Sequence, residues 1–280
     1  MQSIDTRGFP DSIPETVPDD CDLTLFNACY NEEQNILATL ETLLAALSEF
    51  AFRWEIVIID DASRDGSVAA IERFIQDHPG VPIHLYVNPA NRGLGVNFVE
   101  AAFRGRGKYY RLICGDNVEP KETFVEVFRQ LGQADLVLFY QDCTGKALSR
   151  RILSRCYTAL INFLSGHRIR YYNGLPLHVR YHVMRWHTNT HGFGFQADLV
   201  TRLLDQGCSY REVLVKTVER RAGASKVLTV RNICSVANTV LSVFFRRLGQ
   251  SKLFSKRKSQ PVAPCVSDVG DPRGRQRAAA

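Results

Sequence analysis

The sequence predicts an α/β fold built on a mainly parallel sheet. Between Leu23 and Tyr140, short apolar runs alternate with segments of helical periodicity, and the pattern repeats four times. Alternation of strands and helices is typical of parallel sheets that are flanked by helices. With 280 residues, 45% of them hydrophobic, the chain is also long enough to bury a sizeable core.

Each predicted element follows from its periodicity. Five apolar runs have the length of strands: Leu23–Cys29, Glu55–Asp60, Ile83–Asn88, Tyr109–Cys114 and Asp135–Tyr140. Four segments between them repeat apolar residues at i, i+3 and i+4 and are predicted as helices: Glu32–Ser48, Ser67–Asp77, Gly95–Arg104 and Lys121–Leu131. Because open parallel sheets bind ligands at the carboxyl ends of their strands, the residues that follow each run are the first candidates for a functional site.

The pattern changes after Tyr140. The remaining elements are a basic amphipathic segment at 146–166, loops rich in Tyr, Asn, Gly and His, a helix near Phe195–Gln206, a strand at Tyr210–Val218 and an amphipathic segment at Val230–Phe245. We expect a disordered lead-in at 1–22, one domain at 23–230, an amphipathic helix at 231–248 and a basic disordered tail at 249–280.

The formal net charge of +6 lies in the C-terminal region. Residues 246–280 contain nine Lys and Arg but only Asp268 and Asp271, so the rest of the chain is close to neutral. A nucleic-acid binder would need a matching basic face in the core, and none is indicated. The tail instead predicts attraction to an anionic membrane surface.

Other features of the sequence concern location. The eight cysteines are scattered and lack C-x-x-C spacing, which indicates reduced cytosolic thiols rather than disulfides or a thiolate-bound metal. The first 22 residues do not resemble a signal peptide, and no apolar stretch reaches the roughly 18 residues that cross a bilayer. We therefore expect a cytoplasmic protein that binds peripherally to a membrane; the sequence does not indicate an oligomeric state.

Polar residues follow three of the predicted strands. Asn31 is a plausible N-cap for a helix that starts at Glu32. Asp60 and Asp61 follow the second strand, where a carboxylate can bind a ribose or a base, or simply cap the next helix. Asp116 follows the fourth strand and is either a ligand for Mg²⁺ or Mn²⁺ on a diphosphate or part of an Asx-turn.

These segments together resemble family 2 glycosyltransferases with a GT-A fold. The resemblance rests, in order, on Tyr-Asn-Glu-Glu from residue 30, Asp-Asp-x-Ser-x-Asp-Gly-Ser from residue 60, Asn-Arg-Gly from residue 91, and an acid after a strand, and it covers residues 23 to 226. It implies a nucleotide-sugar donor with a site formed by Tyr30, Glu32, Asp60, Asp61, Arg92, Gly93, Asp116 and Asn117. In that site, Asp116 and Asn117 would hold Mg²⁺ or Mn²⁺.

The chain departs from the family pattern at three places. It has Ala28 where the family usually has Pro, and Ala62 where the family has Gly. Gly115-Asp116-Asn117 replaces the family's Asp-x-Asp, and one carboxylate with one amide makes a less charged metal site.

The second half resembles the polyprenyl-phosphate branch of this family, which includes dolichol-phosphate mannose synthase. The features are Phe-Gln-Ala-Asp from residue 195, Tyr-Arg-Glu-Val from residue 210 and Arg-Arg-Ala-Gly-Ala-Ser-Lys from residue 220. The resemblance implies that Asp198 is a positioning residue or a base. It also implies that phosphate oxygens are bound, and the departing diphosphate stabilised, by Arg220, Arg221, Ser225 and Lys226.

The sequence therefore predicts an inverting glycosyltransferase that uses a GDP- or UDP-sugar and a polyprenyl-phosphate acceptor. The alternatives are a family 2 enzyme that acts on a glycan or another hydroxyl acceptor, and a non-catalytic relative that only binds nucleotide-sugars. A dinucleotide-dependent oxidoreductase fits poorly, because the first strand lacks the glycine fingerprint.

Two amphipathic segments bear on membrane binding. Within 149–164, an apolar stripe is formed by Ile152, Cys156, Ala159, Leu160 and Phe163, next to Arg150, Arg151 and Arg155. Such a helix either lies in a membrane interface or packs its stripe on the sheet. The Val230–Phe245 segment repeats the arrangement with Arg246 and Arg247.

Four histidines at 178, 182, 187 and 191 are interpreted as part of a loop region rather than as a metal site.

Overall fold

The structure, a computed structural model, describes residues 21–141, 148–185, 194–216 and 230–250. Within these ranges the strands are β1 (Leu23–Cys29), β2 (Trp54–Asp60), β3 (Ile83–Val87), β4 (Tyr109–Cys114), β5 (Leu136–Gln141), β6 (Leu177–Val179) and β7 (Tyr210–Val215). The helices are α1 (Ile36–Leu47), α2 (Ser67–Asp77), α3 (Leu94–Arg104), α4 (Lys121–Phe128), α5 (Leu148–Ser165), α6 (Arg180–Arg185), α7 (Phe195–Asp205) and α8 (Val230–Gln250).

The strands form one sheet in the order β3-β2-β1-β4-β6-β5-β7. All described pairs are parallel except those of β6, which runs antiparallel to β4 and β5. The prediction of a mainly parallel α/β sheet is confirmed. The prediction of loops between α5 and α7 is wrong for β6 and α6, because elements of three and six residues are too short to produce a detectable period.

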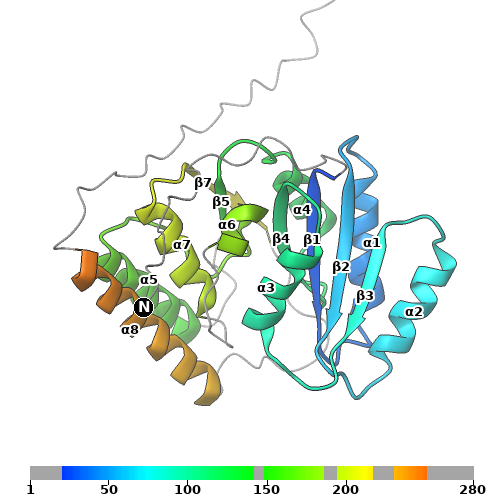
Figure 1. The fold of residues 1–280 in the computed structure, drawn as a ribbon, viewed down its shortest axis with the longest axis horizontal. Coiled ribbons are helices and arrows are strands. Elements are labelled where there is room, and N and C mark those ends of the chain that lie inside the picture. Colours follow the sequence, from blue (N-terminus) through cyan, green and yellow to red (C-terminus); the bar gives the residue numbers. More distant parts are fainter. Residues whose placement is uncertain (1–20, 142–147, 186–193, 217–229, 251–280) are drawn as a thin grey trace, which may run out of the picture.

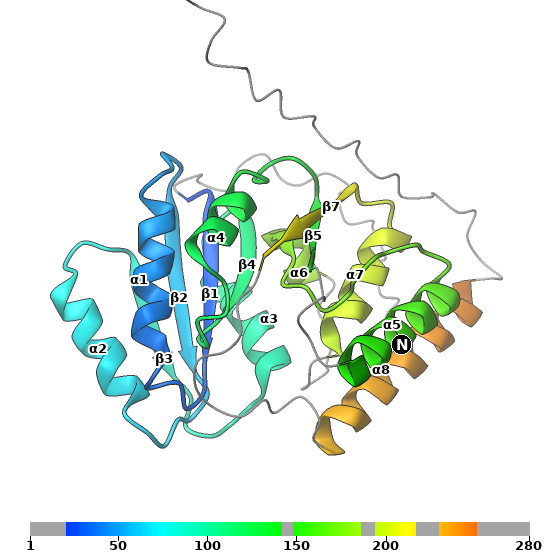
Figure 2. The ribbon, with the colours of Figure 1, turned by 180° about the vertical axis from the view of Figure 1, so that it is seen from behind.

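Helices cover both faces of the sheet, so the fold has three layers (Figures 1 and 2). One core packs α1, α2 and α4 against side chains such as Leu25, Ile58 and Ile113. The other packs α3, α6 and α7 against side chains such as Phe26 and Leu112. The central strand β1 is buried on both sides and reads as an almost continuous apolar run, as expected for a parallel strand.

Helices α5 and α8 lie at one end of the molecule and pack against each other, and α8 also packs on α7 (Figure 1). The predicted apolar stripe of α5 does not face the sheet. Phe163 is 83% exposed, Ile152 and Leu160 are also exposed, and within the described side chains at 151–165 the buried ones are Thr158, Ile161 and Ser165. The alternative that the stripe packs on the sheet is therefore wrong. None of the described helices is long and apolar enough to span a bilayer.

Candidate functional site

The loops that follow β1 and β2 hold each other through hydrogen bonds between backbone and side chains. Three backbone N–H groups of the first loop donate to the second: Asn31 to Ser63 Oγ (2.8 Å), Glu32 to Ser67 Oγ (2.9 Å) and Glu33 to Asp65 Oδ2 (3.2 Å). Two N–H groups of the second loop donate back: Arg64 to Asn31 Oδ1 (2.8 Å) and Gly66 to Glu33 Oε2 (3.0 Å). We call this set, residues 31–33 and 63–67, the loop clamp.

The loop clamp corrects the expected start of the first helix. α1 begins at Ile36 with Asn35 in the N-cap position, so Asn31 is not its cap. The N–H groups of residues 31–33 donate to the second loop and are not part of a first helical turn. The Glu32 carboxylate, expected at the donor site, accepts a hydrogen bond from Asn35 Nδ2 at 2.9 Å.

The two carboxylates after β2 are both hydrogen-bonded within the chain. Asp60 is fully buried and accepts from the N–H and the hydroxyl of Ser63. Asp61, 5% exposed, accepts from the N–H groups of Arg92 and Gly93, both at 2.8 Å, and from Asn88 Nδ2 at 3.0 Å. Asp61 therefore shapes the turn before α3 and does not cap α2.

These contacts control the ionisation of Asp61. Burial raises its pKa, but the hydrogen bonds from Arg92, Asn97, Asn88 and Gly93 together outweigh burial, so the pKa lies below its ordinary value. Asp61 is thus a carboxylate at neutral pH. The adjacent Gly93 has φ of 88°, a conformation that glycine adopts without strain.

Three strand ends turn through non-glycine residues in the left-handed region. The φ angles are 55° at Asn31, 64° at Ala62 and 52° at Asn117. Asparagine tolerates this region better than alanine does, because its side chain can hydrogen-bond locally. The glycine that the family pattern has at position 62 is therefore the residue that this turn favours.

Hydrogen bonds beyond the strands keep the ends of β1 to β4 side by side. The backbone N–H of Asp61 donates to the backbone carbonyl of Cys29 (2.9 Å). In the same way, the N–H of Asn88 donates to the backbone carbonyl of Asp60 (2.9 Å), and the N–H of Gly115 donates to that of Ala28 (3.1 Å). The predicted donor-site residues after β1, β2 and β4 consequently lie along one edge of the sheet.

The end of β4 contains a buried ion pair that the sequence analysis missed. Both guanidinium nitrogens Nη1 and Nη2 of Arg111 donate to the Glu119 carboxylate (3.1 and 2.5 Å), and the two residues are 0% and 8% exposed. The arginine within the apolar run Tyr-Tyr-Arg-Leu-Ile-Cys could have indicated this pair, since a buried charge requires a partner of opposite charge.

The residues that follow β4 determine whether a divalent metal ion could bind at this strand end. The described residues contain no group of three or more His, Cys, Asp or Glu that could hold one. Asp116 and Asn117 are adjacent residues whose side chains carry oxygens, and the Glu119 carboxylate is paired with Arg111. Mg²⁺ usually takes one or two carboxylates and completes its shell with substrate phosphates and water, so the pair suits an ion shared with a diphosphate rather than a protein cage.

A pocket opens where β4 and β5 separate. β6 pairs with β4 only as far as Arg111, and residues 173–175, which precede β6, help to line the pocket beyond it. A Cβ at Gly174 would come within 1.8 Å of the Phe139 carbonyl oxygen, so only glycine fits this approach. The pocket is lined by Arg111, Val118, Glu119, Phe139, Gln141, Asn173, Gly174, Leu175 and Val215.

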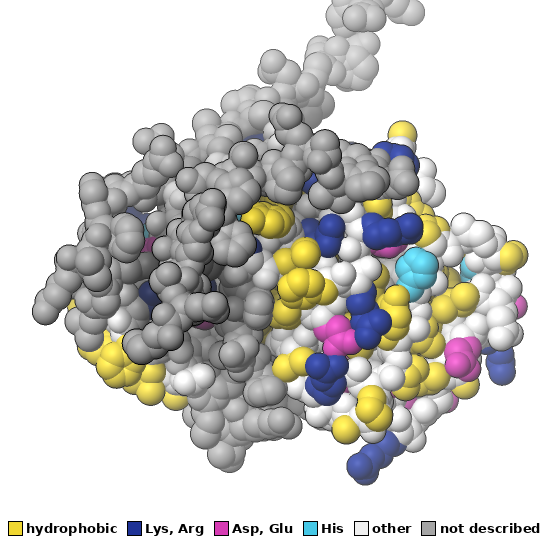
Figure 3. Space-filling model, viewed as in Figure 1, with side chains coloured by type: hydrophobic (Ala, Val, Ile, Leu, Met, Phe, Trp, Pro, Cys, Tyr) yellow, Lys and Arg dark blue, Asp and Glu magenta, His cyan; other side chains and the backbone are white. Residues whose placement is uncertain are grey.

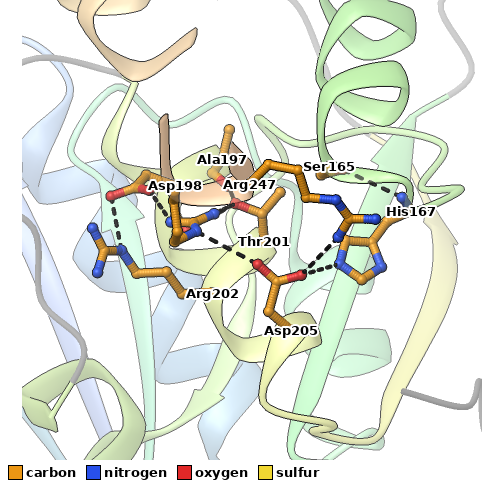
Figure 4. A network of polar contacts seen from close by, with 9 residues as sticks. Ser165, His167, Ala197, Asp198, Thr201, Arg202, Asp205 and Arg247 are labelled. Carbon is orange, nitrogen blue, oxygen red and sulfur yellow. Dashed lines mark hydrogen bonds and ion pairs between the residues drawn. The ribbon is translucent and has the colours of Figure 1, made fainter. Parts of the chain in front are cut away.

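Asp198, the predicted positioning residue or base, lies in a network of ion pairs between α7 and α8 (Figure 4). Its carboxylate accepts from Arg202 Nε at 3.1 Å and from Arg246 Nη1. Arg246 also contacts Thr201 and Asp205, and Asp205 accepts from His167 Nε2 at 2.9 Å. Arg246 was expected to face a membrane, but its side chain is only 14% exposed because these groups surround it.

The structure brings part of the predicted site together. The clamp, Asp61, the Arg92–Gly93 turn and Asp116 share one edge of the sheet, whereas the described ion pairs of Asp198 are with α7 and α8. The Arg92 side chain pairs with Glu100 of α3. The remaining predicted residues lie outside the described ranges: Arg220, Arg221, Ser225 and Lys226.

Known proteins resemble the chain in both sequence and fold. Residues 25–187 match the family model "Glycosyl transferase family 2". A dolichol-phosphate mannosyltransferase of Saccharomyces cerevisiae is 30% identical over 103 residues, which are 36% of this chain and 38% of that protein. One from Mycosarcoma maydis is 28% identical over 189 residues, which are 62% and 61% of the two chains. The match thus spans between about two fifths and three fifths of these relatives' lengths.

Among solved structures, glucosyl-3-phosphoglycerate synthase from Mycobacterium tuberculosis shares the fold. Its crystal structure in complex with Mn²⁺, UDP-glucose and phosphoglyceric acid superposes with a TM-score of 0.58 at 15% identity. The superposition covers 82% of this chain and 80% of that one.

Proposed function

The chain belongs to glycosyl transferase family 2 and has the GT-A fold, and from this premise we propose that it moves a sugar from a GDP- or UDP-sugar to a polyprenyl phosphate, with inversion. The observation that carries the choice of acceptor is the pairing of Asp198. Both of its oxygens contact arginines of α7 and α8, so the carboxylate serves to hold these helices together rather than to act as the base for an alcohol. A phosphate acceptor needs no base, whereas an alcohol does.

The donor is proposed to lie across the carboxyl ends of β1, β2 and β4. Tyr30 borders the nucleoside, and Asp61 acts by holding the Arg92–Gly93 turn in place, since its own oxygens are already bound. The buried Asp60 supports the same surface through Ser63. These roles are supported by the shared edge of the sheet, where ligands bind in open α/β folds.

The leaving group is proposed to depart with help from positive charge. Asp116 and Asn117 fit Mg²⁺ or Mn²⁺, and such an ion, when bound, neutralises charge that develops on the nucleoside diphosphate. Arg220, Arg221, Ser225 and Lys226 provide further donors for phosphate oxygens, with Arg221 assigned to the departing diphosphate.

The transfer itself requires one displacement. A phosphomonoester has a second pKa of about 6 and is mostly a dianion at pH 7, so its oxygen is nucleophilic without proton removal. The oxygen bonds to the anomeric carbon while the bond to the diphosphate oxygen breaks, and the electron pair leaves with the diphosphate. Asp198 is then a positioning residue. The names of the relatives, which include dolichol-phosphate mannosyltransferases, support this acceptor.

We place the reaction at the cytoplasmic face of a membrane to which the protein binds peripherally. The support is the exposed apolar stripe of α5, with Arg155 beside it, and the basic sequence after α8. A lipid-linked acceptor would present its phosphate at such a surface.

The decisive experiment assays transfer from GDP- and UDP-sugars to a short polyprenyl phosphate in detergent, with Mn²⁺ or EDTA. We expect product that depends on the divalent ion, a loss of at least a hundredfold in Asp116→Asn, and a lower metal requirement in Asn117→Asp. A short-chain alcohol serves as the acceptor control. Transfer to the alcohol but not to the phosphate would refute the acceptor, and full activity in EDTA together with an active Asp116→Asn would refute the metal.

A further inference from the structure

Helix α8 has two faces of opposite character. One exposes Leu241, Phe244 and Phe245, which are 53%, 40% and 63% exposed. The neighbouring helix α5 continues this surface with Ile152, Leu153, Leu160 and Phe163, which are 43% to 83% exposed. We call these seven residues the α5–α8 apolar surface; hydrophobic side chains are visible at this end of the molecule in Figure 3.

The other face of α8 is attached to α7 through Arg246. Its guanidinium contacts Asp198, Thr201 and Asp205, which are spaced i, i+3 and i+7 and therefore lie on one side of α7. The side chains of Asp198 and Asp205 are only 3% and 9% exposed. The forked guanidinium thus fixes where α8 sits along α7 and which way the Asp198 carboxylate points.

Charge argues that the apolar surface faces lipid rather than a second copy of the chain. Arg151 and Arg155 lie on α5 beside Ile152, and Arg155 is exposed. Two copies packed face to face would bring these like charges together, whereas an anionic lipid surface would neutralise them.

We propose that the α5–α8 apolar surface docks on an anionic lipid bilayer and that Arg246, as a positioning residue, transmits this docking to Asp198. Docking holds α8 against the protein, and the Arg246 fork then orders the first turn of α7. This inference deepens the proposed function, because it rests on the peripheral membrane binding proposed there and on assigning Asp198 to the site. It makes the stability of the site depend on membrane contact.

The test is hydrogen–deuterium exchange of the full chain with and without vesicles of equimolar phosphatidylcholine and phosphatidylserine. In the wild type, vesicles should slow exchange in α7 at least threefold. Arg246→Ala should bind vesicles like the wild type but lose this protection. Arg246→Lys should recover part of it, because one ammonium group cannot reach Asp198, Thr201 and Asp205 at once.

Matched variants separate docking from coupling. Phe244→Ser/Phe245→Ser should lose vesicle binding at least tenfold, whereas Phe103→Ser, which changes an equally exposed phenylalanine on α3, should retain it. If Arg246→Ala does not fold, Thr201→Val replaces it, because it removes the hydroxyl that accepts from Arg246 and that donates to the Ala197 and Asp198 carbonyls of the same helix. In transfer assays on vesicles, Arg246→Lys should lower kcat with little change in the donor KM.

Three results would overturn the inference. The first is a wild-type protein that does not bind the vesicles, and the second is one that binds them without any change of hydrogen exchange in α7. The third result is a wild-type protein that is a dimer in solution and becomes a monomer in the Phe244→Ser/Phe245→Ser variant. Equal vesicle protection of α7 in Arg246→Ala would overturn the role of Arg246. Exchange requires no turnover, so a chain that shows the coupling but transfers no sugar would refute only the proposed function.

Discussion

The strand-end loops and the α7–α8 contact both hold buried carboxylates, but with different partners. In the loops, Asp61 accepts chiefly from backbone N–H groups of Arg92 and Gly93. Between the helices, Asp198 accepts from the side chains of Arg202 and Arg246. Backbone donors remain whatever residue other than proline is present, whereas side-chain donors are lost with one substitution. The stability of the loops should therefore be sensitive only to substitution of the acceptor side chains. The stability of the helix contact should be sensitive to substitution of either partner.

The largest expected effect is at Asp61. Asp61→Ala removes the acceptor of two buried N–H groups and the Asn88 amide, so we expect the free energy of unfolding to fall by about 3 kcal/mol in urea denaturation. Thermal stabilisation by nucleotide should also be lost.

The ionisation of Asp61 adds a test in acid. Its folded pKa is below the ordinary value, so the stabilisation is present above the unfolded pKa of about 3.9 and is lost as pH falls through the folded pKa. Asp61→Asn, which keeps one oxygen, should be closer to wild type at pH 3 than at pH 7. An Asp61→Ala protein as stable as wild type would contradict the acceptor argument.

Asp205 tests the helix contact. Asp205→Asn keeps the size but removes the charge that faces His167, Arg246 and Arg247, and we expect a loss of about 2 kcal/mol in urea. Nucleotide binding, measured by thermal shift, should not change. Asp77→Asn, at the exposed end of α2, is the control and should be neutral. Weaker nucleotide binding in Asp205→Asn would show that the two regions are not independent.

His178 tests β6, the strand that joins the two halves of the sheet. Burial, and to a lesser degree His182, lowers the pKa of His178 to about 3. The unfolded chain binds this proton below about pH 6.5 and the folded chain does not, so stability should fall by about 1.4 kcal/mol between pH 7.5 and 5.5. Urea denaturation of His178→Phe should show less of this loss than wild type, and the exposed His84→Gln should show all of it.

The smallest expected effect is at Ala62. Ala62→Gly relieves a left-handed conformation at φ 64° but makes the unfolded chain more flexible, and we expect a net gain of about 0.5 kcal/mol. Ala70→Gly, within α2, should instead destabilise, by about 1 kcal/mol. A destabilised Ala62→Gly would mean that the left-handed turn carries little strain.

The sequence predicted the first half of the fold well because its elements are long and periodic. β1 to β5 and the helices between them were placed to within a few residues, with the largest error at the start of α1, where residues 31–33 join the loop clamp. β6 and α6 were missed, since they are short and their positions depend on pairing with β4 and β5.

For the site, the sequence located the strand ends but not the partners. Asp61 was expected to face the nucleoside. Its carboxylate oxygens instead accept hydrogen bonds from the N–H groups of Arg92 and Gly93, about thirty positions away in the sequence. The Arg246–Asp198 pair spans 48 positions, and a basic residue in an amphipathic helix gives no local sign of a buried partner. Contacts of this kind are set by how helices pack, which periodicity does not report.

The loop clamp has a consequence for how related sequences should vary. Each clamp side chain bonds to a backbone N–H, which every residue except proline provides. Positions such as Asn31 and Glu33 should therefore be individually restricted to acceptors, without changing in pairs, whereas Ser63 also donates to the Asp60 carboxylate. Arg246 and Asp198 bond side chain to side chain, so relatives that lose one should also replace the other. An alignment of relatives should accordingly show single-site restriction at the clamp and co-variation between α7 and α8.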